Sequence, residues 1–379
     1  MNHNRIIGIE LFAGCGGLST RFLDAGLAIA SGFEIDRRAV DAYNYNHGHR
    51  GSHGFVTDLS TLSGKTLLEF AGLRSVDFVV GGPPCQPFSI VGKRLGAADE
   101  RADLMTHFVR LICELSPKAF VLENVPNLEK LGGGVVFKET TSGLAELGYS
   151  LWHNVLSAAD FGVPQARKRL ILIGIKGRQK VRGPEASHGG NLRPYVTTRE
   201  AIGDLPDASE FGVTGIHNHE PTMHSADMVE RLRTLAQGRR ERGSFHDRLH
   251  PDRLSYTLRA GSGNFSPLRP IHYNYDRVVT VRESARLQGF SDDFIWPDRI
   301  PRLQQYRQVG NAVPPPLAAA VARCVAEQMH WQSSPEQFVG DVRQRENAIS
   351  MSDEERVALR KARMRGASLG KVALASAGQ

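Results

Sequence analysis

The amino-acid sequence predicts an α/β protein in which a mostly parallel sheet is joined to a smaller, irregular domain. Within the first 175 residues, short apolar runs alternate with helix-like stretches, a rhythm typical of a parallel sheet with helices on both faces. From about residue 177 to residue 263 the chain is rich in Gly, Pro, Asn, Arg and His with weak periodicity. Long irregular stretches of this kind are usually functional loops or separate modules. A chain of 379 residues has room for two or three domains, since one domain takes roughly 150 residues.

Apolar runs mark the expected strands in chain order. They occupy residues 6–12, 27–33, 76–80, 119–122 and 170–175, and a further strand region ends at 57–59. Helix-like stretches between them occupy 18–24, 37–45 and 104–115. Because ligands of such sheets bind at the carboxyl ends of the strands, those ends are the positions to search for chemistry.

Regular patterning returns after the irregular stretch. Thr280 and Glu283 have the spacing of a capping box, which predicts a helix over 280–290. After the proline run 314–316, residues 317–329 are strongly apolar and predict a helix that returns to the first core. The tail beyond Trp331 is polar and basic, and we expect it to be loosely attached.

Charge and cysteine content narrow the class of protein. The formal net charge of +7 favours a polyanionic partner but fits a solvated basic surface equally well. The chain has no run of ~18 uncharged apolar residues, so no transmembrane helix is expected, and its N-terminus lacks the apolar block of a signal peptide. Four scattered cysteines, Cys15, Cys85, Cys113 and Cys324, fit neither a zinc ribbon nor a disulfide framework. We therefore expect a protein that stays where it is made and uses cysteine, if at all, as a thiol.

Three strand ends carry residues suited to a nucleoside cofactor. The first strand leads into a glycine-rich turn over residues 12–17, where glycines let the backbone approach a ligand closely, although such turns also serve plain connections. Glu34 closes the second strand, where a carboxylate commonly accepts a ribose hydroxyl. Asp58 follows the third and could accept the adenine amino group, although each acid could instead cap a helix. The ordered trio lacks a phosphate-binding fingerprint and therefore suggests S-adenosylmethionine.

Two further strand ends carry reactive side chains. Cys85 lies between prolines in GGPPCQPFS, directly after the 76–80 run. A lone cysteine is most often inert core packing, but prolines that fix the backbone at the expected active-site edge favour a nucleophile. Glu123 closes the 119–122 run at the same edge, where it could act as an acid beside the thiolate or cap the next helix.

An ordered set of motifs over about residues 5–328 resembles the cytosine-C5 DNA methyltransferases. The matching segments are ELFAGCGG, GGPPCQPFS, LENV, QARKR at 165–169, RESARLQGF at 282–290 and QVGNAVPPPLA at 308–318. The resemblance implies an S-adenosylmethionine-dependent, Rossmann-like methyltransferase fold with a target-recognition domain. It also implies methyl transfer to C5 of a cytosine that is flipped out of double-stranded DNA.

The resemblance assigns roles to the motif residues. Cys85 would add to C6 of the base, which splits a difficult step into two, and Glu123 would protonate or hydrogen-bond N3. Arg167 and Arg169 match arginines that bind the base O2 and order the site. The residues carried over to the cofactor site are Phe12, Gly14, Gly16, Glu34, Ile35, Asp58, Leu104 and Asn311. Ile35 departs from the aromatic residue that this family often has after the ribose acid.

The resemblance also divides the chain. Residues 1–177 would form the catalytic and cofactor-binding domain. Residues 178–300 would form the target-recognition domain, which includes the penultimate motif, RESARLQGF at 282–290. Residues 301–330 would return to the first domain, and 331–379 would form the tail. Sequence choice would reside in 178–268, and residues 89–101 would close over the flipped base, with Gly92 and Gly96 as hinges. The residues expected to bind DNA are Gln86, Ser89, Arg239, Arg240 and Arg242.

The expected setting is a bacterial or phage restriction–modification system. The partner is double-stranded DNA, and a cognate endonuclease would act on the same site without needing to bind this protein. We expect a monomer, located in the bacterial cytoplasm with the DNA and without a metal. His217, His219 and His224 lack Cys or acidic residues at ligand spacing and are expected to be surface histidines near DNA.

Three alternatives compete with this reading. A related enzyme type methylates tRNA, but it carries a Cys-Phe-Thr element that is missing from this sequence. A non-catalytic DNA-binding homologue would lose the Cys or Glu, whereas Cys85 and Glu123 are both present. A nicotinamide dehydrogenase on a similar sheet would need a phosphate fingerprint and gives no role to the PPCQ segment.

Overall fold

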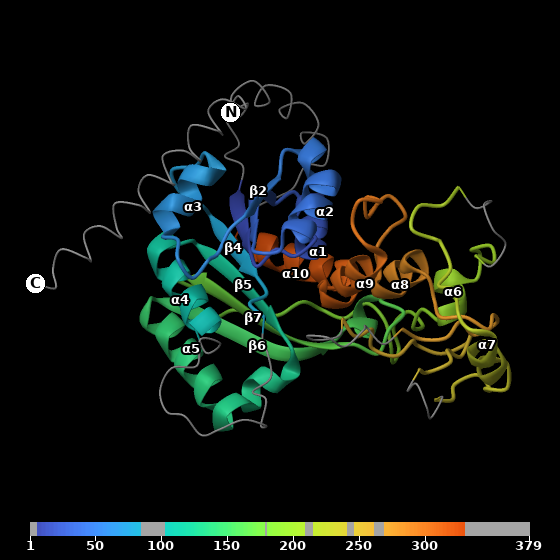
Figure 1. The fold of residues 1–379 in the computed structure, drawn as a ribbon. Coiled ribbons are helices and arrows are strands. Elements are labelled where there is room, and N and C mark those ends of the chain that lie inside the picture. Colours follow the sequence, from blue (N-terminus) through green and yellow to red (C-terminus); the bar gives the residue numbers. More distant parts are fainter. Residues whose placement is uncertain are drawn as a thin grey trace, which may run out of the picture. The chain divides into compact units, whose positions relative to one another are not determined.

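This computed structural model describes residues 6–84, 103–178, 180–208, 215–240, 246–260 and 269–329. Within them, seven strands form one sheet (Figure 1). The strand order is β3-β2-β1-β4-β5-β7-β6. The strands are β1 (Ile7–Leu11), β2 (Ala28–Glu34), β3 (His53–Val56), β4 (Phe78–Gly81), β5 (Ala119–Asn124), β6 (Tyr149–Ser157) and β7 (Lys168–Lys176). The order reverses between β1 and β4, and such a switch point is where open α/β sheets bind their ligands.

The sheet is parallel from β3 to β5, as the alternating pattern predicted. The 170–175 run lies in β7, which pairs antiparallel with both β5 and β6, so the sheet is mostly parallel, as predicted. The connection from β6 to β7 contains only the short 3-10 turn Ala158–Phe161 and a loop, and a parallel return would need a longer crossover. The sequence reasoning missed β6, whose polar residues at the sheet edge break the apolar run.

Helices cover both faces of the sheet. One face carries α1 (Gly17–Asp24) and α10 (Pro315–Gln328), and the other carries α3 (Gly64–Ala71), α4 (Asp103–Leu115) and α5 (Val135–Glu146). Side chains alternate between the two faces along β4, where Phe78 and Val80 belong to one buried cluster and Val79 to the other. This double burial explains why the central strands read as continuous apolar runs.

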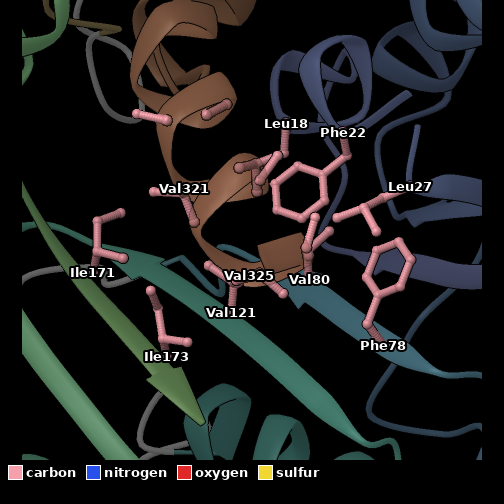
Figure 2. Close-up of a cluster of buried hydrophobic side chains, with 14 of the residues drawn as sticks. Leu18, Phe22, Leu27, Phe78, Val80, Val121, Ile171, Ile173, Val321 and Val325 are labelled. Carbon is pink, nitrogen blue, oxygen red and sulfur yellow. The ribbon is translucent and has the colours of Figure 1, made fainter. Parts of the chain in front are cut away.

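The C-terminal helix α10 returns to the first core, as the apolar stretch after the prolines predicted. Val321 and Val325 of α10 pack with Leu18 and Phe22 of α1 over the strand residues, including Val121 (Figure 2). Residues 315–328 are therefore part of the layer that supports the strand ends.

The remaining helices are α2 (Arg37–His47), α6 (Thr198–Ile202), α7 (Ala226–Arg233), α8 (Val281–Gln288) and α9 (Arg302–Asn311). A third buried cluster includes residues of all of these except α7. The cluster joins residues such as Trp296 and Leu258 to Cys15 and Ala42 of the first half. The capping box of α8 is confirmed, since the Thr280 hydroxyl accepts from Glu283 N and the Glu283 carboxylate accepts from Thr280 N. Residues 1–334 form one compact unit, and the finer boundaries at 177, 300 and 330 stay predictions.

Candidate active site

The glycine-rich turn after β1 is shaped by backbone conformations that favour glycine. Gly14 and Gly16 have φ angles of 55° and 88°, and Phe12 between β1 and this turn also has a positive φ of 55°. Gly16 is the N-cap of α1. A Cβ at Gly16 would lie 2.3 Å from Nε2 of His47, whereas a Cβ at Gly14 would meet nothing within 4 Å. A side chain at Gly16 would thus overlap His47 of α2, whereas the space next to Gly14 is open.

Glu34 closes β2 beside this turn. Its Oε2 accepts from Gly14 N at 2.9 Å, and its Oε1 accepts from Ile35 N and Asp36 N at 2.8 and 2.9 Å. Ile35, next along the chain, is 67% exposed. The structure therefore brings two of the predicted cofactor residues, Gly14 and Glu34, into direct contact, with an exposed apolar side chain alongside.

The other expected cofactor residues lie on separate elements. Asp58 is exposed after β3, where hydrogen bonds from Ser60 lower the pKa of its carboxyl group. Leu104 is half-buried in the first turn of α4, and Asn311 is exposed at the end of α9.

Glu123 and Arg169 form a buried ion pair at the ends of β5 and β7. Nε of Arg169 lies 2.8 Å from Oε1 of Glu123, and the two side chains are only 12% and 10% exposed. Glu123 is opposite Ile171 in the antiparallel register, so Arg169, two residues away on β7, reaches it diagonally. Burial raises the pKa of Glu123 even though the nearby arginine charges oppose the shift.

The segment leading to Cys85 approaches the same carboxylate. A Cβ at Gly82 would lie 3.0 Å from Oε2 of Glu123, and Asn124 donates from Nδ2 to the Pro83 carbonyl at 2.9 Å. The polypeptide between β4 and Cys85 is thus fastened to the end of β5. Cys85 itself lies outside the described residues, as do Gln86, Ser89 and the proposed closing loop 89–101.

Arg167 occupies a different environment from Arg169. It is 1% exposed, and it donates to the carbonyl oxygens of Leu258 at 3.2 Å and Gly310 at 2.8 Å. Burial, with the charge of Arg169, lowers the pKa of Arg167 to about 9. The two motif arginines are therefore distinct: Arg169 pairs with the carboxylate, and Arg167 binds main-chain carbonyls of two later segments.

Sequence reasoning missed two glutamines that tie the motifs together. Gln165 donates to Oε1 of Gln288 at 2.7 Å and accepts from Leu258 N at 3.1 Å. Gln288 in turn donates to the Ala312 carbonyl at 2.6 Å. Both glutamines lie inside motifs that the sequence displayed, but their partners are 24 to 123 residues away along the chain, and no local pattern signals such a contact.

A buried acid under the glycine-rich turn was also missed. Glu10 of β1 is 2% exposed, and its Oε2 accepts from Ser19 N at 3.2 Å and from the Ser19 hydroxyl. The hydroxyl of Ser19 continues to that of Tyr43 at 2.7 Å. Burial raises the pKa of Glu10 to about 8. The sequence did carry a signal for this residue, because Glu10 is an acid within the apolar run 6–12.

Two of the three arginines that were expected to bind DNA lie on the surface. Arg239 and Arg240 are exposed, and Arg242 lies outside the described residues. The expectation of surface histidines is wrong for His219, which is 2% exposed and lies between the Thr280 hydroxyl and the Pro206 carbonyl at 2.9 and 2.8 Å.

No group of three or more metal-ligating side chains occurs among the described residues. In the same part of the chain, every helix is too short or too polar to cross a membrane.

Comparisons with known proteins point to one family. The sequence model of one family, described as C-5 cytosine-specific DNA methylase, matches residues 6–327. The type II methyltransferase M1.HphI of Haemophilus parahaemolyticus is 39% identical over 328 residues, covering 84% of this chain and 86% of that protein. The type II methyltransferase M.XorII of Xanthomonas oryzae pv. oryzae is 34% identical over 365 residues, covering 84% of each chain.

Solved structures share the fold. A crystal structure assigned to a DNA modification methyltransferase encoded within an E. coli prophage superposes with a TM-score of 0.73 at 27% identity. The match covers 86% of this chain and 99% of that one.

Proposed function

The chain belongs to the C-5 cytosine-specific DNA methylases and is a DNA (cytosine-5)-methyltransferase of the restriction–modification type. From this premise we propose that it methylates a flipped cytosine in one specific sequence of double-stranded DNA, through a covalent Cys85–C6 adduct. The observation that carries the proposal is the buried Glu123–Arg169 pair beside Gly82 and Pro83. The pair supplies an acid of raised pKa and a fixed guanidinium group. Gly82 and Pro83, which lie at the end of β5 beside it, are three and two residues before Cys85 in the sequence.

The proposed chemistry begins at Cys85. Its thiolate adds to C6, and the electron pair of the C5–C6 double bond moves toward C5, while Glu123 donates to N3 and limits the charge that builds on the ring. C5 would then take the methyl group from the sulfonium of S-adenosylmethionine, whose S–CH3 bond breaks with the electron pair staying on sulfur, so that the neutral thioether S-adenosylhomocysteine leaves. Loss of the C5 proton to a base restores the double bond and expels the thiolate, so the enzyme is regenerated.

Arg169 and Arg167 take separate parts in this proposal. Arg169 holds the Glu123 carboxylate at 2.8 Å and presents its remaining N–H groups to the O2 side of the base. Arg167 orders the site from behind, because its donors are engaged by the carbonyls of Leu258 and Gly310. Guanidinium groups suit both tasks, because they hold their N–H donors in a fixed geometry and because they keep their charge when buried.

Enzymes of this family use S-adenosylmethionine, which supplies a methyl group on a sulfonium. The turn between β1 and α1 fits such a molecule, because the space above Gly14 is open and Ile35 offers an exposed apolar side chain to an adenine. We assign Glu34 to the ribose hydroxyls and Asp58 to the adenine amino group. The remaining residues proposed to line this site are Phe12, Gly14, Gly16, Leu104 and Asn311.

The biological role proposed is protection of DNA from a cognate restriction endonuclease. Domain 1–177 would hold the chemistry and the cofactor, and 178–300 would choose the sequence, with 178–268 as its variable part. The protein would act as a monomer, and the endonuclease would act on the same site without binding it.

A trapping experiment tests the adduct. Duplex DNA in which the target cytosine is replaced by 5-fluorocytosine should form a covalent complex with the parent protein, because fluorine cannot leave C5 as a proton does. Cys85→Ser should form no complex and leave no methylated cytosine in bisulfite sequencing, while it still binds S-adenosylmethionine. Normal turnover by Cys85→Ser would refute the adduct. Methylation of tRNA instead of DNA would favour the related RNA-modifying activity.

A further inference from the structure

Residues 238–240 and 247–248, within the stretch of irregular structure, pair as a short antiparallel ribbon. Arg240 and Asp247 face each other across an antiparallel bridge, and Arg248 N donates to the Arg239 carbonyl at 2.8 Å while Gly238 N donates to the Arg248 carbonyl at 3.0 Å. A ribbon of two strands is one of the few elements that fit the major groove of DNA.

The base of the ribbon is anchored in the protein. Arg248 is 5% exposed, and its Nη2 lies 2.7 Å from Oδ1 of Asp276 and also donates to the Leu232 carbonyl. Tyr256 donates to the Gly238 carbonyl at 3.1 Å. These contacts fix the position of the exposed end that carries Arg240.

Arg240 is held by one side of its guanidinium. Nε donates to Oδ1 of Asp247 at 2.8 Å, and Nη2 donates to Oδ2 at 2.9 Å. The carboxylate thus occupies the side-on fork and leaves Nη1 and the outer N–H of Nη2 for another partner. The Arg240 side chain is 53% exposed, and that of Asp247 is 18% exposed, so the free end of the fork can reach a ligand.

A cavity of about 180 Å³ lies against this pair. Its lining is rich in donors and cations, and includes Arg240, His246, Asp247, Tyr256, Arg259 and Arg269. The segment that carries Arg259 adjoins the active-site network, because the Leu258 carbonyl accepts from Arg167. The lining of this cavity therefore adjoins, through Leu258 and Arg259, the segment that Arg167 holds.

We propose that Arg240, oriented by Asp247, reads a guanine in the major groove and determines one position of the recognition sequence. This assignment rests on the proposed function. Asp247 neutralises the charge of Arg240, which weakens its attraction to phosphate, but leaves two parallel donors in a fixed direction. Guanine presents O6 and N7 as two acceptors that match such a fork. Arg239, which neighbours Arg240 on the ribbon and has no side-chain ion pair with a described residue, is instead suited to phosphate.

The test begins with the parent protein. Bisulfite sequencing of DNA methylated in vitro maps the site, and failure to methylate any DNA cytosine would refute the proposed function rather than the role of Arg240. Duplexes carrying 7-deazaguanine at each guanine of the mapped site, one at a time, then replace N7 by C–H. One position should weaken binding about 3- to 10-fold, roughly half of a bidentate contact.

Variants of Arg240 and Arg239 then show which arginine contacts the sensitive guanine. Arg240→Ala and Arg240→Lys should both lose the 7-deazaguanine effect, and bisulfite sequencing should show other bases accepted there, with discrimination reduced about 5- to 150-fold. Lys keeps the charge but lacks the fork, so its loss of discrimination separates fork from charge. Arg239→Ala, the matched control, should weaken binding to all duplexes equally and keep the sensitive guanine. No sensitive guanine in the parent, or the same sensitivity in both Arg240 variants, would overturn the assignment.

Discussion

Nε2 of His47 lies 3.1 Å from the carbonyl oxygen of Gly16, so the end of α2 is hydrogen-bonded to the start of α1. His47 also packs against Tyr43, with ring centroids 4.6 Å apart. Burial lowers the pKa of His47 to about 3, which keeps the ring neutral and the contact intact near neutral pH. The glycine-rich turn of the proposed cofactor site therefore rests on a buried aromatic pair from the neighbouring helix.

Gly16→Ala should destabilise the protein because the new methyl group would overlap His47 and the φ of 88° is unfavourable for alanine. We expect a loss of about 1–3 kcal/mol in the free energy of unfolding, the usual cost of a strained backbone position. Urea denaturation measures it. Gly14→Ala is the matched control, since its φ is 55° but its Cβ would meet open space; an equal loss in both variants would mean that the contact with His47 adds nothing.

Glu10→Gln should change how stability depends on pH. Because burial raises the pKa of Glu10 to about 8 from an ordinary 4.5, the folded protein holds a proton that the unfolded chain releases. Its contribution is therefore fully present below about pH 4.5 and is lost as pH rises to about 8, by up to ~1.4 kcal/mol per pH unit. Gln does not titrate, so the variant should gain stability relative to the parent between pH 5 and pH 8. Urea denaturation at several pH values measures the difference in unfolding free energy between the variant and the parent. A difference that stayed constant with pH would contradict the prediction.

Glu123→Gln should reduce methylation by about 10²–10⁴-fold, the range for removing a general acid. The amide still fits beside Arg169, and the variant should bind S-adenosylmethionine as the parent does, because the carboxylate is assigned to the base. Initial rates on the mapped duplex and equilibrium titration of the cofactor separate the two effects. A rate within a few-fold of the parent would remove Glu123 from the chemistry.

Glu34→Ala and Asp58→Ala should each weaken binding of S-adenosylmethionine by about 1–3 kcal/mol, as expected for a lost hydrogen bond to a buried polar group. Glu34 also orders the turn through Gly14 N, so its replacement should have the larger effect. Ser60→Ala is a useful control, because Ser60 holds the Asp58 carboxylate at 2.6 Å and its loss should give a smaller change. Unchanged affinity in both acidic variants would show that the ends of β2 and β3 are misassigned.

The sequence predicted the central strands and the site edge well because both depend on local signals. Phe78 to Val80 are apolar in succession since both faces of the sheet are buried, and Thr280 and Glu283 cap a helix within four residues. The direction of β7 and the contacts of Gln165 could not be predicted, because they depend on pairings with distant segments. His219 looked like a surface residue for the same reason: its partners at Pro206 and Thr280 are 13 and 61 residues away.

Exchange of the recognition segment tests where sequence choice resides, and the structure defines the junction. Residues up to 254 can be replaced without touching the catalytic network, whereas Ser255 N donates to the Pro164 carbonyl and Leu258 N donates to Gln165. A chimera that takes 178–254 from a homologue of different specificity should therefore fold more stably than one that takes 178–268.

Both chimeras should methylate C5 of cytosine, because Glu123 and Arg169 lie outside the exchanged segment. If 178–254 contains the determinants, as the position of Arg240 and Asp247 within it implies, bisulfite sequencing should find the donor's site in place of the parent's. A shift seen only with 178–268 would assign part of the choice to residues 255–268. A folded, active pair of chimeras that both kept the parent's site would instead place recognition in the catalytic half, since the exchanged segment would then contribute only phosphate contacts, which position DNA without reading its sequence.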